Sequence, residues 1–304
     1  MKSQSSKLYI DVVKALLNHS DRMVTIHTVD PEAVSDAFQM ATDRLPEVLG
    51  VRSISCSTTM FWCRVCIQYT ESRSEWIGIM QQVDEGIEKL FSPIMGLDEY
   101  SKVLRVHDWL AENVTYTTEG VPESMAQAFL KREANCVGFS KLAKRILDHL
   151  GVRSTIVLGE SRDGKGHAWN LVRIDGKWYH NDFTYDQNLS VYGLNYSYNN
   201  LTDAQILRDH DFDGGMYPRS SDRDLNWYRI NGLDVCCWEE LEVLLAEGIR
   251  SGFSEMRLSG NIGRSLESTV KDRVRAMMSK HDVKSYLMSY SSDTRVLSIK
   301  EAVS

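Results

Sequence analysis

The chain has 304 residues, of which 42% are hydrophobic, and its 42 acidic and 35 basic residues give a formal net charge of −7. This length predicts two or three domains with enough apolar residues for packed cores. The sequence has no Lys/Arg-rich run, which argues against nucleic-acid binding, and no apolar stretch long enough to span a membrane.

The ends of the chain and its cysteines favour a cytoplasmic protein. The N-terminus, MKSQSSKLYIDVVKALLNHSD, lacks the apolar stretch of roughly 7–15 residues that a signal peptide needs. Six cysteines are too few for a disulfide framework in a chain of this size. We therefore expect localisation in the cytoplasm.

Residues 1–94 are predicted to form a small α/β module with the element order α-β-α-β-β. Its helices are expected at YIDVVKALLNHSD and PEAVSDAFQMATDRLPEVLG, and its strands at RMVTIHTVD, VRSISCST and FWCRVCIQY. Cys63 and Cys66 lie in the last strand, where their spacing places them on opposite faces. Packing is therefore favoured over zinc or redox chemistry for these two residues.

A cysteine opens the most regular helix of the sequence, NCVGFSKLAKRILDHLG. Its apolar residues recur at helical spacing, Asn135 is a suitable N-cap, and Gly151 is suited to a left-handed C-terminal position. Cys136 then lies in the first turn, where the helix dipole stabilises a thiolate and backbone N–H groups can hold an oxyanion. The alternative is a small buried cysteine that only fills space.

A hairpin with a histidine and an aspartate follows this helix. The segments HAWNLVRI and KWYHNDFT flank Asp175-Gly176, a strong two-residue turn signal. In the register that this turn sets, His167 and Asp182 share one face as diagonal neighbours, so the carboxylate can orient the imidazole. A cysteine, a histidine and a carboxylate are the groups that a thiol enzyme requires.

Two other residues of the hairpin region share this face by parity. Asp186 is the rival carboxylate, and we rank it behind Asp182 because it lies beyond the predicted strand. His180 is expected to be an ordinary, partly exposed strand histidine.

The segments NCVGFSKLAKRILDHLGV and GHAWNLVRIDGKWYHNDFTYD resemble the bacterial transglutaminase-like domain of the papain-like cysteine enzymes. KVLRVHDWLAENVTY resembles the family's opening helix and NNLTDAQILRDH its post-catalytic segment, so the resemblance covers about residues 95–212. It implies an α+β, papain-like core in which the cysteine helix packs on an antiparallel sheet that carries the histidine and the aspartate. It also implies that Cys136 is the nucleophile, His167 the base and Asp182 the orienting carboxylate. Val137 departs from the acidic or polar residue that the family commonly has there, which bears on substrate preference.

Three further residues are candidates for the cleft. Gln127 is a candidate oxyanion donor, because related enzymes place a glutamine before the nucleophile, although an exposed helical position is favoured for it. Trp169 can line the cleft beside the base, although a packing role is favoured. Tyr192, in the tyrosine-rich segment SVYGLNYSYNN, can shape one wall.

The catalytic core is assigned to residues 95–215, and residues 216–304 are predicted to form a second α-β-α-β-β module. Its helices are expected at WEELEVLLAEGI and RSLESTVKDRVRAMMSKHD, and its strands at FSEMRLSG, VKSYLMSYS and RVLSIKE. The shared element order indicates a possible repeat of the first module, with a role in recognising a partner or the substrate protein. Cys236 and Cys237 are interpreted as packing residues, and DFDGG lacks the other ligand positions of a calcium loop.

The sequence therefore predicts a cysteine-dependent acyl-transfer enzyme that acts on a peptide or protein through a thioester intermediate, without a metal or another cofactor. Water as acceptor gives a peptidase or amidase, and a lysine amine gives a protein-glutamine acyltransferase. Hydrolysis is favoured because the sequence has no calcium motif. The alternative is a non-catalytic protein-interaction module that retains the transglutaminase-like fold, while an arylamine-type acetyltransferase is less well supported. The oligomeric state is left open.

Overall fold

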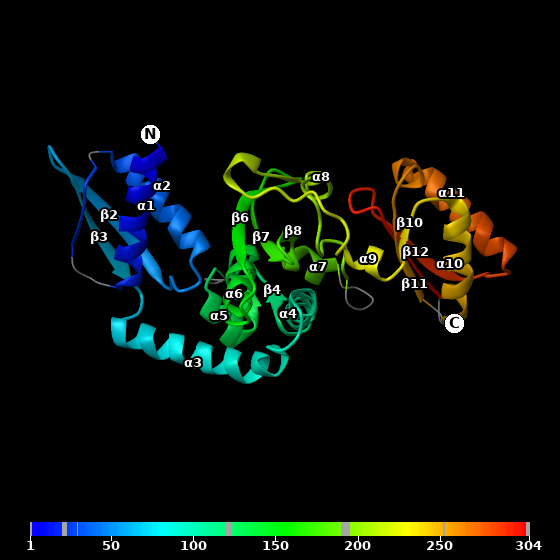
Figure 1. Ribbon diagram of the computed structural model, residues 1–304, viewed down its shortest axis with the longest axis horizontal. Helices are drawn as coiled ribbons and strands as arrows, with labels where there is room; N and C mark the ends of the chain where they lie inside the picture. Colours follow the sequence, from blue (N-terminus) through cyan, green and yellow to red (C-terminus); the bar gives the residue numbers. More distant parts are fainter. Residues whose placement is uncertain are drawn as a thin grey trace. The chain divides into compact units, whose positions relative to one another are not determined.

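The computed structural model describes residues 2–19, 23–28, 30–119, 123–189, 195–251 and 253–301 (Figure 1). Helices and mostly antiparallel strands occur together, which confirms the predicted α+β class. The chain divides into two compact units. The first comprises Met1–Gly159, Gly166–Gly176 and Asp182–Leu194, and the second comprises Glu160–Lys165, Lys177–Asn181 and Asn195–Ser304. The three-domain boundaries proposed from the sequence stay a prediction.

The first elements follow the predicted order α-β-α-β-β. They are α1 (Lys2–Leu17), β1 (Val24–Ile26), α2 (Pro31–Arg44), β2 (Val51–Thr58) and β3 (Cys63–Tyr69). The strands form an antiparallel sheet of order β1-β3-β2. The Asp30 carboxylate caps α2 by accepting the N–H groups of Glu32 and Ala33. Buried side chains of both helices and of β3 form one core cluster, which includes Val12, Phe38 and Ile67, and this common core holds the module together.

Cys63 and Cys66 differ in burial, as expected for opposite faces of β3. Cys63 is buried in the core of this module, whereas Cys66 is partly exposed. Burial, together with the neighbouring Cys56 thiol and the charge of Asp30, raises the pKa of Cys63 to about 11. Cys63 therefore stays a protonated, apolar packing residue at neutral pH.

Helices dominate the segment between the first sheet and the hairpin. α3 (Arg73–Phe91) starts with a capping box between Ser72 and Glu75. It is followed by α4 (Glu99–Asn113), β4 (Thr115–Tyr116), α5 (Met125–Lys131), β5 (Glu133–Ala134) and α6 (Cys136–His149). α6 is the predicted cysteine helix, and Gly151 follows it with the expected positive φ of 74°. Its apolar stripe is fully buried and consists of Phe139, Leu142, Ala143, Ile146 and Leu147.

Arg145 connects the cysteine helix to earlier parts of the first unit. Its guanidinium Nη2 lies 2.6 and 2.7 Å from the two carboxylate oxygens of Asp84 on α3, and its Nη1 lies 3.0 Å from Glu47 Oε1. The bidentate contact with Asp84 restricts the orientation of both side chains. This network therefore fixes α6 relative to α3 within the first unit.

The predicted hairpin consists of β7 (Gly166–Ile174) and β8 (Lys177–Asn181). Its turn residues Asp175 and Gly176 have φ values of 49° and 83°, as a type I′ turn requires. The hairpin belongs to a four-stranded sheet of order β8-β7-β6-β9, with β6 at Ser154–Ser161 and β9 at His210–Asp211. α7 (Phe183–Leu189) begins soon after β8. β8 ends at Asn181, three residues before Thr184, where the sequence pattern predicted the strand to end.

The second unit ends with the other predicted α-β-α-β-β segment. This segment consists of α10 (Trp238–Ser251), β11 (Phe253–Leu258), α11 (Glu267–Lys280), β12 (Tyr286–Tyr290) and β13 (Val296–Glu301). Earlier in the second unit lie α8 (Asp203–Ile206), α9 (Trp227–Ile230) and β10 (Asp234–Val235). The sheet order is β10-β11-β13-β12. Strands β11, β13 and β12 thus repeat the order of β1, β3 and β2, with antiparallel pairing in both sheets. This shared topology supports the proposed repeat.

The packing role predicted for Cys236 is wrong. Cys236 is exposed and Cys237 is only partly buried. Both lie in the short link between β10 and α10, where the backbone N–H of Cys236 donates to the Glu240 carboxylate at 2.9 Å. The link runs over the surface to reach the helix start, so the Cys236 side chain has no core to enter.

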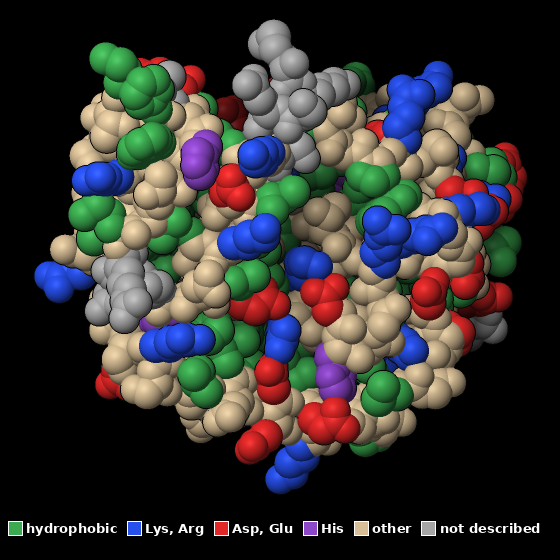
Figure 2. All heavy atoms as spheres, turned by 60° about the vertical axis from the view of Figure 1, so that its left-hand side comes forward, with side chains coloured by type: hydrophobic (Ala, Val, Ile, Leu, Met, Phe, Trp, Pro, Cys, Tyr) green, Lys and Arg blue, Asp and Glu red, His purple; other side chains and the backbone are tan. Residues whose placement is uncertain are grey.

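The surface has mixed charge. Basic and acidic side chains are interspersed over the face that Figure 2 shows. Within the described ranges, no helix combines the length and the apolar composition that crossing a bilayer requires.

Candidate active site

Cys136 is the first residue of α6, at the position predicted from the sequence. Asn135 is the N-cap, and its Oδ1 accepts the N–H of Gly138 at 3.1 Å. The cysteine is a free thiol with 9% of its surface exposed. The first turn of a helix presents unpaired N–H groups and the positive end of the dipole, so the thiol lies where an anion is stabilised.

His167 and Asp182 are in direct contact, as the hairpin argument predicted. His167 Nε2 lies 2.7 Å from Asp182 Oδ2, and the two side chains are 6% and 1% exposed. Asp182, however, lies after the last residue of β8 rather than within the strand. Its Oδ1 accepts the N–H groups of Thr184 and Tyr185 at 3.1 and 3.0 Å, so it also caps α7.

The imidazole of His167 connects the carboxylate to the thiol. Its Nε2 bonds to Asp182, and the Cys136 side chain is a second hydrogen-bond partner of the ring. Because Nε2 is already occupied by the carboxylate, the other ring nitrogen, Nδ1, is the one that bonds to the sulfur. Burial alone would lower the pKa of His167. The charge of Asp182, its hydrogen bond and the contact with Cys136 outweigh burial and raise the pKa to about 10. The imidazolium form is therefore favoured at neutral pH.

Two aromatic rings pack against this histidine. Trp169 lies on the same strand, with its ring stacked at a centroid distance of 5.9 Å, and is only 1% exposed. Tyr185, on α7, has its ring centroid 4.8 Å from that of His167. Trp169 is thus buried against the ring of the base, and its place in the cleft stays a prediction. The sequence reasoning missed Tyr185, although its place three residues after Asp182 was an available signal.

Residues 93–183 match the family model described as transglutaminase-like superfamily. This segment is transglutaminase-like. The match includes Cys136, His167 and Asp182, and it confirms the resemblance predicted from the sequence for the core.

Three known proteins are similar to parts of this chain in sequence or structure. Kyphoscoliosis peptidase of Mus musculus is 27% identical over 127 residues, which cover 35% of this chain and 19% of the peptidase. The chain thus spans about a fifth of the length of this curated relative. A crystal structure of a TGase has a TM-score of 0.33 at 18% identity over 53% of this chain and 50% of that chain. For a candidate cysteine protease from Cytophaga hutchinsonii, the TM-score is 0.31 at 16% identity over 57% of this chain and 68% of that chain.

The other two candidate cleft residues stay predictions. Gln127 lies on α5 of the transglutaminase-like core and is partly buried rather than fully exposed, with its backbone N–H donating to Ser124 Oγ at 3.4 Å. Its role as an oxyanion donor is not tested by this contact. Tyr192 lies outside the described residues.

Asp186, the rival carboxylate, has a different partner. It lies on α7 and is fully buried, and its Oδ2 is 3.1 Å from His107 Nε2 on α4. The parity argument for Asp186 assumed a continuing strand, but the chain is already helical there. The sequence reasoning missed His107 as a partner, because the two residues are 79 positions apart.

The expectation of a partly exposed His180 is wrong. His180 has 0% exposure, and its Nε2 lies 2.9 Å from Asp203 Oδ1. Its backbone exchanges two hydrogen bonds with Leu201, each 2.8 Å, so a later segment of the second unit covers it. Burial lowers the pKa of His180 despite the opposing charge of Asp203.

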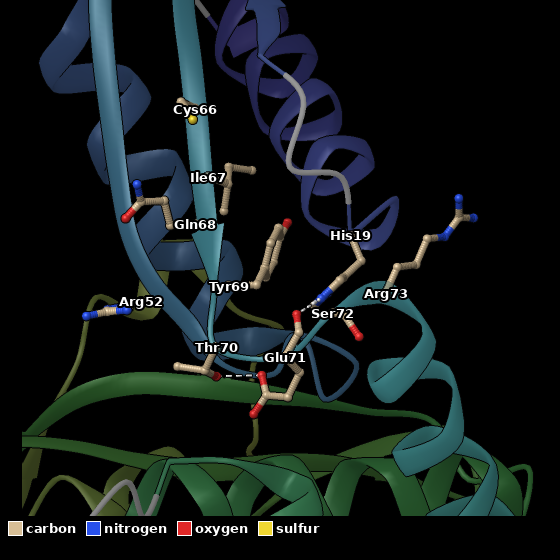
Figure 3. Close-up of a pocket in the computed structure, with 10 residues that line it drawn as sticks. All are labelled: His19, Arg52, Cys66, Ile67, Gln68, Tyr69, Thr70, Glu71, Ser72 and Arg73. Carbon is tan, nitrogen blue, oxygen red and sulfur yellow. Dashed lines mark hydrogen bonds between the residues drawn. The ribbon is translucent and has the colours of Figure 1, made fainter.

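A separate cavity of about 940 Å³ lies in the N-terminal module (Figure 3). His19 points towards Glu71, and its Nε2 donates to the backbone carbonyl of that residue at 2.9 Å, while Thr70 Oγ1 donates to the Glu71 carboxylate at 2.5 Å. The side chains of Arg52 and Arg73 extend away from this pair in the same view. The polar groups at its centre thus bond to one another, and we assign no ligand to this cavity.

Proposed function

We propose that the protein is a cysteine-dependent acyl-transfer enzyme with Cys136 as nucleophile, His167 as acid and base, and Asp182 as orienting carboxylate. The observation that carries the proposal is the 2.7 Å contact between His167 Nε2 and Asp182 Oδ2, in a histidine that also bonds to the Cys136 side chain. A thiol, an imidazole and a carboxylate in this order form the arrangement of a thiol hydrolase or transferase.

The chemistry follows from the positions of the three groups. The Cys136 thiolate attacks a peptide or carboxamide carbonyl, and first-turn N–H groups of α6 are candidates to stabilise the oxyanion. His167 gives its proton to the departing nitrogen as the C–N bond breaks, which leaves an acyl thioester on Cys136. His167 then takes a proton from the second nucleophile, and the C–S bond breaks to release the thiolate. Asp182 holds the imidazole in the required orientation throughout.

The acceptor determines which member of this reaction class the enzyme is. Water gives a peptidase or amidase, and a lysine amine gives a protein-glutamine acyltransferase. The two share the thioester and differ only in which nucleophile reaches it. We favour hydrolysis of a peptide or protein substrate, as for the relative named as a peptidase.

One observation favours the alternative of a non-catalytic interaction module. Cys136 is only 9% exposed, which limits the approach of a substrate carbonyl to its sulfur. A reagent small enough to enter the site distinguishes the two functions, because only a poised thiolate reacts when ordinary thiols are protonated.

The test is the rate of iodoacetamide labelling at each cysteine as a function of pH, read by peptide mass spectrometry. If the triad is poised, Cys136 labels faster at pH 6.5 than the exposed Cys56, despite its greater burial. His167→Gln abolishes this advantage, whereas the control His149→Gln, at the other end of α6, retains it. Labelling of Cys136 no faster than Cys56 in the unaltered protein would instead support the interaction module.

A further inference from the structure

A second buried histidine lies between two carboxylates in the transglutaminase-like core. His107 on α4 is 1% exposed, with Nε2 3.1 Å from Asp186 Oδ2 and Nδ1 3.0 Å from Asp108 Oδ1. Ionised carboxylates only accept hydrogen bonds, so both ring nitrogens donate and the ring is an imidazolium. Burial opposes this charge, but the bonds to Asp108 and Asp186 outweigh it and raise the pKa of His107 to about 9.

Asp186 connects this cation to the candidate triad through one helical turn. It is fully buried on α7, four residues after Asp182, and its backbone N–H donates to the Asp182 carbonyl at 3.1 Å. The Asp182 carboxylate caps the same turn through Thr184 and Tyr185. A shift of α7 at Asp186 would therefore also move Asp182.

The length of α7 makes such an anchor necessary. The helix has seven residues. A helix this short is not stable alone in water, so its position is set by its tertiary contacts. One of these is the ion pair to α4, and another is the Tyr185 ring, 4.8 Å from the imidazole of His167. The same short element thus contacts His107 on one side and the triad histidine on another.

We propose that the His107–Asp186 ion pair positions the triad, because it anchors α7 to α4 and thereby fixes Asp182 against His167. Both are positioning residues, because they act on Asp182 through α7. This inference rests on the proposed function. It matters for rate because a displacement of about 1 Å in a catalytic group can cost on the order of 100-fold.

Asp186→Asn and Asp108→Asn form a matched pair of variants for the test. Each removes one carboxylate charge from the same histidine, but only Asp186 lies on α7, whereas Asp108 lies on α4 beside His107. Two readouts are compared below the unfolding temperature of every variant. They are the pH dependence of Cys136 labelling by iodoacetamide, and amide hydrogen exchange of the α7 peptide.

We expect Asp186→Asn to slow labelling of Cys136 at pH 6.5 by at least about tenfold and to move the pH of half-maximal labelling upward. Exchange within α7 should rise in the same variant, while Asp108→Asn changes labelling by less than about twofold. Equal labelling in the two variants, or faster exchange in α7 without slower labelling, would overturn the positioning role and leave the proposed function intact. If Cys136 is not poised even in the unaltered protein, the proposed function fails instead. In that case the amide hydrogen exchange of α7 still tests the ion pair, because exchange in Asp186→Asn that equals that of the unaltered protein would show that the pair does not anchor α7.

Discussion

Asp182→Asn tests whether the carboxylate controls the protonation of His167. The amide oxygen can still accept the N–H groups of Thr184 and Tyr185, so the cap of α7 is retained. The amide NH₂ then faces His167 Nε2, which must accept a hydrogen bond and carry its proton on Nδ1, towards the sulfur. His167 in this tautomer cannot take the thiol proton from Cys136.

The size of the effect follows from the two protonation states. Without the Asp182 charge and its hydrogen bond, burial lowers the pKa of His167 from about 10, and the contact with Cys136 only partly opposes this fall. Cys136 then has no imidazolium partner to stabilise its thiolate, and an ordinary thiol is only about 1% ionised at pH 6.5. We therefore expect iodoacetamide labelling of Cys136 at this pH to fall on the order of 100-fold.

The stability of the protein should change with pH in the same variant. In the unaltered protein the pKa of His167 is about 10 when folded and about 6.5 when unfolded, so the folded state holds an additional proton between these values. Its contribution to stability is complete below pH 6.5 and disappears as the pH rises through 10. The total is on the order of 5 kcal/mol as an upper estimate, and Asp182→Asn should remove this dependence from urea unfolding curves.

Asp98→Asn is the matched control, because Asp98 also caps a helix, α4, by accepting the N–H of Ser101 at 2.8 Å. It should leave both the labelling rate and the pH dependence unchanged. If Asp182→Asn labels within about threefold of the unaltered protein at pH 6.5, the carboxylate does not control the imidazole and the triad assignment is refuted.

Three other changes test the surrounding structure. Gly86→Ala places a Cβ 2.5 Å from the buried Phe129 ring and should destabilise the protein by about 1–3 kcal/mol. Gly78→Ala in the same helix places its Cβ where no atom lies within 4 Å, so it should stabilise the protein by about 0.5–1 kcal/mol. The midpoints of urea unfolding measure both changes. Asn135→Ala removes the cap of the cysteine helix and should cost about 1 kcal/mol, while Asn135→Ser should retain most of it, by thermal unfolding. The raised pKa of His107 makes the folded state hold an additional proton between pH 6.5 and 9, so the unaltered protein should lose on the order of 3 kcal/mol of its free energy of unfolding across this range. His107→Gln should remove this loss. The same dependence of the free energy of unfolding on pH in both proteins would contradict the prediction.

The cysteine helix and the hairpin turn could be predicted because their signals are local. The apolar stripe of α6, the cap at Asn135 and the Asp175-Gly176 turn each depend on residues within one helix or one turn, and each is found in the structure. The His167–Asp182 contact followed from them, since a two-residue turn sets the register of the residues beside it.

The errors arise where a strand ends or where the partner is distant in sequence. β8 ends at Asn181, so alternation of faces no longer applies to Asp186, which is helical and bonds to His107. The burial of His180 depends on the chain near Leu201, which no local pattern of the hairpin indicates. Periodicity describes an element while it lasts, but it contains no information about which distant segment will cover it.

Four buried histidines among the described residues lie against carboxylates, namely His107, His167, His180 and His210. The first three show that the geometry of such a pair alone does not decide its role. His107 bonds to a second carboxylate through its other nitrogen, so it is held as a cation with no lone pair to accept a proton. Burial lowers the pKa of His180, so this ring is held neutral beside Asp203. His167 alone among these three has a thiol as its second partner, so only there can a proton move between the imidazole and a nucleophile. The chemistry of the site is therefore specified by the group on the second nitrogen, which is why the contact of His167 with Cys136, more than its contact with Asp182, should decide whether this core is an enzyme.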